Sequence, residues 1–237
     1  MIKAIGVVVP AVDEQMTIGD CLEALVVARA HARAANSRDI DVRILVVLDS
    51  CVDGTEAIVR SHRHVQSHVC LVGRVGAARA AGTQRLLSDI GVPLPHVWLA
   101  NTDADSIVPP DWLTIQLEEA NAGAQLILGT VQLGYGLPAA IEQAWLERHD
   151  QSEQHPHVHG ANLGIRADVY SALGGWSAHQ SGEDIDLARR ASSSGDLQIV
   201  RTGRIPVRTS SRLVGRAPHG FAGYLRRLTL DSGDVAV

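Results

Sequence analysis

The 237-residue sequence carries a net charge of −5 and is 46% hydrophobic, which suits one α/β domain with a sizeable core. The negative charge argues against a nucleic-acid-binding protein, whose contact face is usually basic. Three cysteines without metal-type spacing argue against a disulfide framework and favour a reducing, cytoplasmic compartment. No apolar stretch approaches the roughly 20 residues of a membrane span, so we expect a soluble protein without a transmembrane segment.

The first half of the chain alternates short apolar runs with helical patterns. The runs predict strands at Ala4–Val9, Val42–Leu48, Val69–Val72 and His96–Ala100. Apolar residues at helical spacing predict helices at Asp20–Ala35, Thr55–His62, Val75–Ser88 and Trp112–Ala122. Because runs that are apolar at successive positions suit parallel strands covered on both faces, the alternation predicts a doubly wound, mostly parallel α/β sheet.

The second half of the chain is less regular. It predicts strands at Leu126–Leu133 and Ala161–Ile165, and helices at Ala139–Asp150, Glu183–Ser194 and Phe221–Leu230. A histidine-rich loop, HPHVHG, follows the first of these helices. No internal repeat or low-complexity linker interrupts the chain, so we expect a single domain over residues 1–237.

Acidic residues follow three of the predicted strands. They are Asp13 and Glu14 after the first strand, Asp49 and Asp53 after the second, and Asp103 and Asp105 after the fourth. The ligand of a doubly wound sheet lies beyond the carboxyl ends of its strands. The sequence therefore predicts that carboxylates gather at the ligand-binding edge of the sheet.

The segment NTDADS carries the strongest chemical signal. In extended geometry Asp103 and Asp105 point to the same side of the chain, where they offer oxygen ligands to a divalent cation and its bound diphosphate. The alternative is that both acids only cap the following turn. The apolar strand VWLAN before them, together with the acids of two other strands, favours the cation site, and Mg²⁺ or Mn²⁺ suits it best.

Two further segments offer contacts to a nucleotide. In LDSCVDGT, Asp49 ends a strand and could accept hydrogen bonds from a base or ribose, whereas Asp53 suits a turn and helix-cap role. In GRVGAARAAG, the glycines lack dinucleotide-loop spacing, but small residues let a helix begin close to a ligand. Arg79 then either reaches a base or phosphate or lies on the surface of an alanine-rich helix, and both interpretations stay open.

The segment GGWSAHQSGEDIDLARR places Glu183 and Asp184 at the start of a predicted helix. The helix dipole alone stabilises acidic residues at such a position. A glycine-flanked loop that ends in a fixed carboxylate also suits a general base beside a substrate hydroxyl. Both interpretations are compatible with the residues.

Six segments occur in a fixed order over most of Ile5–Arg190: PAVDE, LDSCVDGT, GAARAAG, NTDADS, GANLGIR and GEDIDLARR. In order and spacing they resemble the glycosyltransferases of family 2, which have the GT-A fold. The resemblance implies a single GT-A domain, with residues 1–106 as a Rossmann-like nucleotide-sugar-binding half and residues 107–237 as an acceptor-binding half with a C-terminal helix. It also implies a metal-dependent, inverting transfer of a sugar from a nucleoside-diphosphate sugar to an acceptor hydroxyl.

The same resemblance implies roles for individual residues. Asp184 would be the catalytic base, and Asp105 would coordinate Mn²⁺ or Mg²⁺. Donor-binding roles would fall to Pro10, Ala11, Glu14, Asp49, Arg79, Asp103, Asn162 and Glu183. Among these, residues 10–14 and Asp49 would contact the nucleoside, Arg79 the base or phosphates and Asp103 the ribose side. Asn162 would line the sugar and acceptor pocket.

Departures from the family pattern narrow the expected reaction. No Q-x-x-R-W follows the GED segment and no apolar stretch is long enough to span a membrane, whereas processive polysaccharide synthases of the family normally have both. A single-transfer enzyme is therefore favoured. PAVDE lacks the aromatic residue and asparagine that usually precede the glutamate, and Leu48 stands where a first aspartate is common.

Histidines offer a second set of metal ligands. His155, His157 and His159 alternate, so in an extended chain they would project to one side and could bind a metal. His219 could add a metal ligand from a C-terminal loop that folds over the site, as in some relatives. An ordinary polar loop position is the favoured alternative for each of these histidines.

Two other functions stay open. A sugar-phosphate nucleotidyltransferase usually has a glycine-rich loop with a basic residue after its first strand, whereas Asp13 and Glu14 follow here. A non-catalytic nucleotide-sugar-binding protein has no need of Asp103, Asp105 and Asp184 together. The expected partners are a nucleoside-diphosphate sugar and an acceptor that the sequence does not identify, with no nucleic acid. Peripheral membrane contact is expected only if the acceptor is a lipid.

Overall fold

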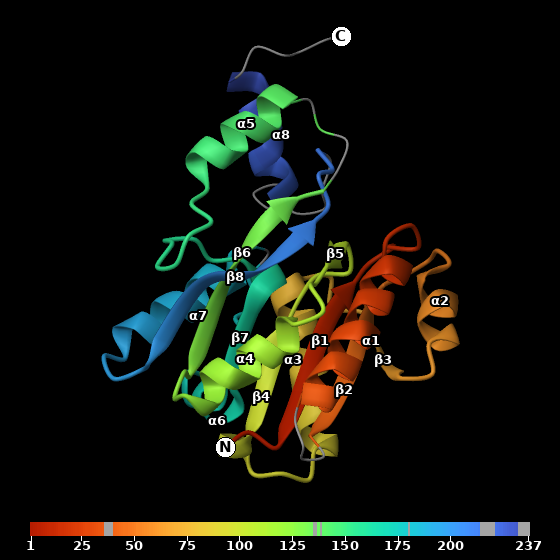
Figure 1. Ribbon diagram of the computed structural model, residues 1–237. Helices are drawn as coiled ribbons and strands as arrows, with labels where there is room; N and C mark the ends of the chain where they lie inside the picture. The colour runs from red at the N-terminus through yellow and green to blue at the C-terminus, as the bar shows by residue number, and fades with distance from the viewer. Residues whose placement is uncertain (36–39, 135–136, 138, 180, 214–220, 232–237) are drawn as a thin grey trace.

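The computed structural model describes residues 1–35, 40–134, 137, 139–179, 181–213 and 221–231. These residues form an eight-stranded sheet in the order β3-β2-β1-β4-β7-β6-β8-β5 (Figure 1). The strands are β1 (Ala4–Ala11), β2 (Asp41–Asp49), β3 (Val65–Cys70), β4 (Val97–Asn101), β5 (Ser106–Ile107), β6 (Leu126–Leu133), β7 (Leu163–Arg166) and β8 (Ile199–Thr209). The first four strands in the chain, β1 to β4, therefore occupy one side of the sheet, and the strands that follow occupy the other.

The strand directions follow from the pairing. Strand β1 is parallel to both β2 and β4, and β2 is parallel to β3. Strand β7 is antiparallel to its neighbours β4 and β6, whereas β6 is parallel to β8. The short β5 pairs antiparallel with the end of β8. The mostly parallel α/β sheet is confirmed, with β7 as the antiparallel strand that joins its two sides.

Helices cover both faces of the sheet. They are α1 (Ile18–Ala35), α2 (Thr55–Ser61), α3 (Val75–Asp89), α4 (Trp112–Asn121), α5 (Ala139–Arg148), α6 (Ala167–Ala172), α7 (Glu183–Ser193) and α8 (Phe221–Asp231). Helices α1 and α4 pack into one hydrophobic core, and α3, α6 and α7 pack into another on the opposite face (Figure 1). None of the helices in the described part of the chain has the length and apolar character to cross a bilayer.

Helices α5 and α8 form a separate layer beyond the end of β6 (Figure 1). Their own small core contains Trp145 of α5, Leu225 of α8 and Val131 of β6. Phe221 and Tyr224 of α8 turn their rings edge-on to Trp145. Aromatic packing therefore holds α8 against α5 and the end of β6.

The structure corrects three expectations about the strands. The third strand covers Val65–Cys70 instead of Val69–Val72, because it is an edge strand that pairs only with β2 and leaves the apolar Leu71 exposed in the following loop. The short strand expected at Ala161–Ile165 begins after a 3₁₀ turn, at Leu163. Strand β8 was not predicted, because its three arginines, glycine and proline disguise the alternation that buries Ile205 and Val207.

Helix α3 packs closely on the sheet at Gly82. A Cβ atom at Gly82 would collide with the side chain of Val47 and come within 3.0 Å of the side chain of Val8. The absence of a side chain lets the helix approach β1 and β2 at this point. This approach places the preceding turn of α3, which carries Arg79, over the carboxyl ends of the strands.

Candidate active site

The carboxyl ends of β2, β1 and β4 lie next to one another because these strands are parallel neighbours in the sheet. Glu14 follows β1, Asp49 is the last residue of β2, and Asp103 and Asp105 lie in the turn between β4 and β5. The predicted gathering of carboxylates at one edge of the sheet is confirmed. The hydrogen bonds and ion pairs of each carboxylate then indicate whether it holds a loop in place or faces a ligand.

Asp49 is 1% exposed and holds the loop that leads into α3. Its Oδ1 atom accepts hydrogen bonds from the backbone N–H of Val72 at 2.8 Å and from the Ser50 hydroxyl at 3.1 Å. Asp49 thus joins the end of β2 to the segment after β3. A nucleoside contact by Asp49 stays a prediction.

Pro10 and Ala11 are the last two residues of β1. Ala11 is almost fully buried, and its carbonyl oxygen accepts a hydrogen bond from the Cys51 thiol at 3.4 Å. This contact joins the end of β1 to the loop after β2. The expected donor contacts of Pro10 and Ala11 stay predictions, and their backbone lies at the edge where such contacts are expected.

Asp13 and Asp53 organise the loops beside these strand ends. Asp13 has a positive φ of 44°, and its Oδ1 accepts a hydrogen bond from the N–H of Val52 at 2.7 Å. Asp53 accepts a hydrogen bond from the N–H of Thr55 at 2.9 Å, at the start of α2. The predicted turn role of Asp53 is confirmed, whereas its helix-cap role is wrong, because the N-cap residue of α2 is Gly54.

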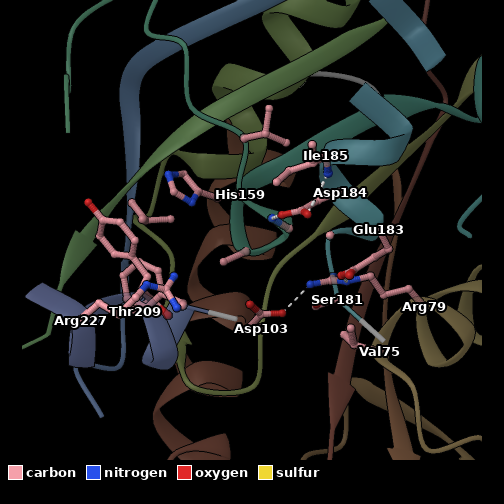
Figure 2. A pocket seen from close by; sticks show the side chains of 17 residues that line it. Val75, Arg79, Asp103, His159, Ser181, Glu183, Asp184, Ile185, Thr209 and Arg227 are labelled. Atoms are coloured by element: carbon pink, nitrogen blue, oxygen red, sulfur yellow. Dashed lines mark hydrogen bonds and ion pairs between the residues drawn. The ribbon is translucent and has the colours of Figure 1, made fainter. Parts of the chain in front are cut away.

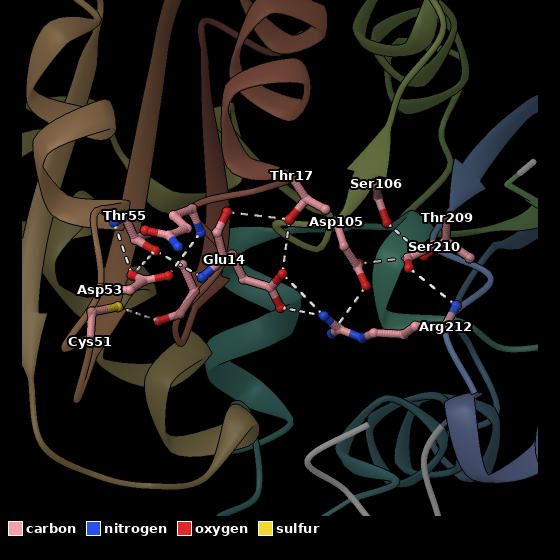
Figure 3. A network of polar contacts seen from close by, with 12 residues as sticks. Glu14, Thr17, Cys51, Asp53, Thr55, Asp105, Ser106, Thr209, Ser210 and Arg212 are labelled. Atoms are coloured by element: carbon pink, nitrogen blue, oxygen red, sulfur yellow. Dashed lines mark hydrogen bonds and ion pairs between the residues drawn. The ribbon is translucent and has the colours of Figure 1, made fainter. Parts of the chain in front are cut away.

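Glu14 and Asp105 are bridged by Arg212, which follows β8 (Figure 3). Nη1 of Arg212 lies 2.9 Å from Oε1 and 3.1 Å from Oε2 of Glu14, and Nη2 lies 3.1 Å from Oδ2 of Asp105. Glu14 also accepts a hydrogen bond from the Thr17 hydroxyl at 2.8 Å. The C-terminal part of the chain therefore closes on the acids of the N-terminal part.

Asp105 is held from β8 as well as from its own turn. Its carbonyl oxygen accepts a hydrogen bond from the N–H of Ser210 at 3.1 Å, and its side chain lies 3.5 Å from the Thr209 hydroxyl (Figure 3). Burial and the neighbouring charge of Asp103 raise the pKa of Asp105 to about 6, although Arg212 acts in the opposite direction. Asp105 is a carboxylate that needs a positive partner to stay ionised.

Arg79 lies at the centre of a second ionic cluster (Figure 2). It is 1% exposed, it pairs through Nη2 with Oδ1 of Asp103, and its Nε lies 3.5 Å from Oε1 of Glu183. The Trp176 ring centroid lies 5.5 Å from the guanidinium carbon. The sequence left open whether Arg79 reaches a ligand or lies on the surface of the helix. The surface position is wrong, because the side chain is buried.

A cavity of about 340 Å³ opens beside this cluster (Figure 2). Residues of several elements line it: strands β6 and β8, helices α3, α7 and α8, the turn that follows β4, the 3₁₀ turn before β7 and the loop before α7. Arg79, Asp103, Glu183 and Asp184 form its charged side. Asp103, in the turn after β4, and the start of α7 thus face one common space.

Asp184 is fixed at the wall of this cavity. Its Oδ2 accepts a hydrogen bond from the N–H of Gly160 at 2.7 Å, and its Oδ1 accepts one from the N–H of Ile185 at 2.8 Å. Burial raises the pKa of Asp184, and these two N–H groups and Arg79 offset the rise only in part. Burial likewise raises the pKa of Glu183, against the opposing charge of Arg79.

The opposite side of the cavity is aromatic and apolar. It carries His159, Phe221, Tyr224 and Arg227, together with Val131, whose hydrophobic cluster Phe221 and Tyr224 pack against. The rings of His159 and Phe221 meet edge to face, with their centroids 6.5 Å apart. A ligand in this cavity would therefore meet carboxylates on one side and aromatic rings on the other.

Asn162 takes a different place from the one expected. It is 1% exposed, and its side-chain amide donates to the carbonyl oxygens of Thr130 at 2.8 Å and Ile205 at 2.7 Å. Its Oδ1 accepts a hydrogen bond from the indole N–H of Trp112 at 2.8 Å. Asn162 is absent from the described lining of the cavity, and its side chain joins β6, β8 and α4.

The histidines of the HPHVHG loop are stacked and do not converge on a point. His149 stacks on Trp145 and on His157, with ring centroids 3.3 and 4.7 Å away, and His157 stacks in turn on His159 at 6.0 Å. Within the described ranges, no three His, Cys, Asp or Glu side chains are placed to hold a metal ion together. The metal-binding interpretation of the three loop histidines is therefore wrong for this arrangement, and His219 lies outside the described residues.

The carboxylates at the carboxyl ends of the strands nevertheless suit a divalent cation of the hard, oxygen-preferring kind. Mg²⁺ and Mn²⁺ in nucleotide sites take one or two carboxylates, and water and substrate phosphates complete the shell. Asp105, together with Asp103 two residues earlier, supplies that number of carboxylates at the correct edge of the sheet. A protein-only cluster of three ligands is not required for such a site.

Arg212 and Thr209, like the cavity residues Phe221 and Tyr224, are residues of the site that the sequence interpretation missed. Thr209 is the last residue of the unpredicted strand β8, and Arg212 follows it. Arg212 is 198 positions from its partner Glu14. No local pattern links residues at such a separation. A correct prediction of β8 would have been the available signal, because β8 is parallel to β6 and also ends at the carboxyl edge.

Residues 6–174 match the family described as Glycosyl transferase family 2. The chain belongs to this family. No curated protein matches its sequence. Membership agrees with the order of the motifs and with the sheet described above.

Three solved structures with the same fold are described by the ligands bound to them. TarS 1–349 from S. aureus, in complex with UDP-GlcNAc, is 14% identical, with a TM-score of 0.65 over 97% of this chain and 66% of that one. The mannosyltransferase PcManGT from Pyrobaculum calidifontis, in complex with GDP-Man and Mn²⁺, is 17% identical, with a TM-score of 0.59 over 96% and 70%. Glucosyl-3-phosphoglycerate synthase from Mycobacterium tuberculosis, in complex with UDP, is 16% identical, with a TM-score of 0.57 over 98% and 80%. The chain thus spans just under two thirds of the length of TarS 1–349.

Proposed function

We propose that this protein transfers a sugar from a nucleoside diphosphate to the hydroxyl group of an acceptor. The observation that carries the proposal is the buried carboxylate of Asp184, which two backbone N–H groups fix at the wall of a cavity that Asp103 also lines. Family membership and the sugar nucleotides bound to two of the structural neighbours support the same activity.

The donor would lie along the carboxyl ends of β1, β2 and β4. Its nucleoside would rest against the ends of β1 and β2, where Ala11 and Asp49 lie, and its ribose near Asp103. Arg79 would position Asp103 through their ion pair, since the guanidinium is buried and already paired on both sides. Glu183 would complete this positioning, because it is buried against the same guanidinium.

Asp184 would act as the general base. It would take the proton of the acceptor hydroxyl while the acceptor oxygen forms a bond to the anomeric carbon of the donor. The bond from that carbon to the diphosphate oxygen would break, and its electron pair would leave with the nucleoside diphosphate. Attack from the face opposite the leaving group would invert the anomeric centre, and we infer an inverting reaction. The missing Q-x-x-R-W segment favours the transfer of a single sugar. A raised pKa suits Asp184 for this role, because a base works best when its pKa approaches the working pH.

Asp105, with Asp103 beside it, would hold a divalent cation. When bound, Mn²⁺ or Mg²⁺ would neutralise charge that develops on the diphosphate. The Mn²⁺ in the PcManGT complex, a structure with the same fold, supports a cation in this proposal. The choice between the two metals and a ligand role of His219 remain predictions.

The acceptor would occupy the cavity between Asp184 and the aromatic side. His159, Phe221 and Tyr224 would pack against its apolar face, while its hydroxyl points to the carboxylate. A cytoplasmic location, indicated by the cysteine pattern, remains part of the proposal.

A thermal-shift panel of UDP-, GDP- and dTDP-sugars, each with and without Mn²⁺, tests the donor assignment. A ligand that binds only the folded state stabilises it by about 2.7 kcal/mol at a hundredfold excess over its Kd. We expect one nucleotide series to raise the melting temperature, and to do so more strongly with Mn²⁺. A panel in which no sugar nucleotide shifts the melting temperature would contradict the proposed donor site.

A further inference from the structure

Arg212 lies between two largely buried carboxylates, those of Glu14 and Asp105. They belong to the edge of the sheet where the sugar nucleotide would bind, here called the donor edge. The guanidinium of Arg212 contacts both oxygens of Glu14 and Oδ2 of Asp105, at distances between 2.9 and 3.1 Å (Figure 3). Glu14 is 6% exposed, and the Asp105 side chain is 11% exposed. Ionised carboxylates at such depth need a positive partner, because little water reaches them.

The guanidinium approaches from the solvent side of this pair. The Arg212 side chain is 38% exposed, three to six times as much as those of the carboxylates it bridges. It belongs to the segment after β8, whereas Glu14 and Asp105 are fixed by the loops after β1 and β4. Arg212 is therefore the member of the triad that can move away without opening the core.

Arg212 also occupies the face of Asp105 that a metal ion would need. Oδ1 of Asp105 lies beside the Thr209 hydroxyl, while Oδ2 faces the guanidinium. A divalent cation would bind a carboxylate oxygen at about 2.1 Å, closer than the Nη2 atom lies now. Two positive groups at that separation repel one another, so one oxygen cannot serve both at full strength.

We propose that Arg212 occupies the cation position of the donor site in the ligand-free protein, and that a divalent cation binds Asp105 only by displacing it. The inference rests on the proposed function in one respect, namely that Asp105 is a metal ligand. It follows that the metal alone binds weakly. A nucleoside diphosphate favours the exchange, because its negative charge accompanies the incoming cation and offers the released guanidinium a new partner.

The test is the affinity of Mn²⁺ for the full chain without nucleotide, measured from the electron paramagnetic resonance signal of free Mn²⁺. Arg212→Gln removes the competing charge and keeps a polar, although shorter, side chain. We expect the Mn²⁺ affinity to rise about tenfold, the equivalent of about 1.4 kcal/mol. An affinity that stays the same or falls would overturn the proposal.

Arg204→Gln is the matched control. Arg204 also lies on β8, but its partners are Glu118 and Glu119 of α4, away from the donor edge. Its substitution should leave the Mn²⁺ affinity unchanged. If Arg212→Gln does not fold, Arg212→Lys takes its place, because one ammonium group cannot bridge both carboxylates. A smaller gain in affinity then supports the proposal, and no gain overturns it.

Asp105→Asn separates this inference from the proposed function. If the variant loses Mn²⁺ binding while Arg212→Gln leaves it unchanged, Asp105 is a metal ligand and only the displacement of Arg212 is wrong. If Asp105→Asn binds Mn²⁺ as the unaltered protein does, the metal role of Asp105 in the proposed function is wrong as well.

Discussion

Asp184 and Gly160 are joined by a hydrogen bond of 2.7 Å from the backbone N–H of the glycine to Oδ2 of the carboxylate. The two residues are separated by 24 positions in the sequence. Gly160 lies on the 3₁₀ turn before β7, and Asp184 lies at the start of α7. With Ile185 donating to the other oxygen, the carboxylate is oriented before any substrate arrives. A fixed orientation is what a general base requires, since its proton acceptor must already point at the substrate.

Gly160→Ala should impair turnover through this contact. A Cβ atom at Gly160 would lie 2.9 Å from Nη2 of Arg79 and 3.5 Å from Oδ2 of Asp184, so the guanidinium or the turn must shift. Because a displacement of about 1 Å can lower a rate about a hundredfold, we expect kcat to fall by about one to two orders of magnitude. Gly19→Ala is the control, because a Cβ atom there meets nothing within 4 Å. Equal kcat values for the two variants would contradict the role of the turn.

The rate should fall on the acid side at a higher pH than an ordinary aspartate would dictate. Burial raises the pKa of Asp184, and only the deprotonated carboxylate accepts a proton, so kcat increases as the pH rises through that pKa. We therefore expect the midpoint of the acid limb to lie above about pH 4. Burial raises the pKa of Asp105 to about 6. Donor affinity measured over the same pH range therefore reports on Asp105 separately from Asp184. A kcat that is flat down to pH 4 would show that Asp184 is not the base.

Arg79→Met should destabilise the fold as well as the site. The substitution keeps an apolar side chain over Trp176 but leaves the 5%-exposed Glu183 without its guanidinium partner. Removing one member of a buried ion pair costs about 3 kcal/mol. We expect the free energy of unfolding in urea to fall by about this amount. Arg85→Met, on the same helix but in an exposed pair with Asp89, should change it by less than about 1 kcal/mol.

The histidine stack should make stability depend on pH. Burial lowers the pKa of His149 to about 4 and that of His159 to about 3, so the native rings stay neutral where unfolded histidines, with a pKa near 6.5, take up protons. The unfolded state then binds more protons, and the free energy of unfolding falls as the pH is lowered from about 6.5 towards 4.

His149→Phe keeps a ring against Trp145 but removes one titrating group. Its unfolding free energy should therefore fall less steeply between about pH 6.5 and 4 than that of the unaltered protein. His64→Gln, at an exposed position, should leave the slope as it is. Parallel curves for the unaltered protein and His149→Phe would contradict the buried, neutral state of this ring.

The parts of the fold that the sequence predicts well are those whose pattern is local. Strands β1, β2, β4 and β6 are buried apolar runs, and their residues alone set the sheet direction and the positions of the acids that follow. Strand β8 has a weaker pattern, because it alternates arginines with apolar residues and contains Gly203 and Pro206. It becomes a strand through its pairing with β6 and β5.

The site shows the same division between local and long-range information. Asp103, Asp105 and Asp184 are found from motifs, because strand ends and helix starts are local features. The bridge from Arg212 to Glu14 spans 198 positions and depends on the complete sheet. Asn162 lies in a motif of the family, yet its amide is engaged by β6, β8 and α4, which only the packed structure reveals.

The release of nucleoside diphosphate from sugar nucleotides tests the central claim most directly, when the unaltered protein and Asp184→Asn are compared in the same assay. Asp186→Asn serves as the control, since Asp186 lies on the same helix and pairs with Arg189 and Arg190. We predict that the unaltered protein and Asp186→Asn release the diphosphate from one donor. Asp184→Asn should bind that donor equally well. It should release the nucleoside diphosphate at least about a hundredfold more slowly than the unaltered protein. Equal release by Asp184→Asn, or no release from any donor by the unaltered protein, would contradict the assignment of Asp184 as the base of a sugar transferase.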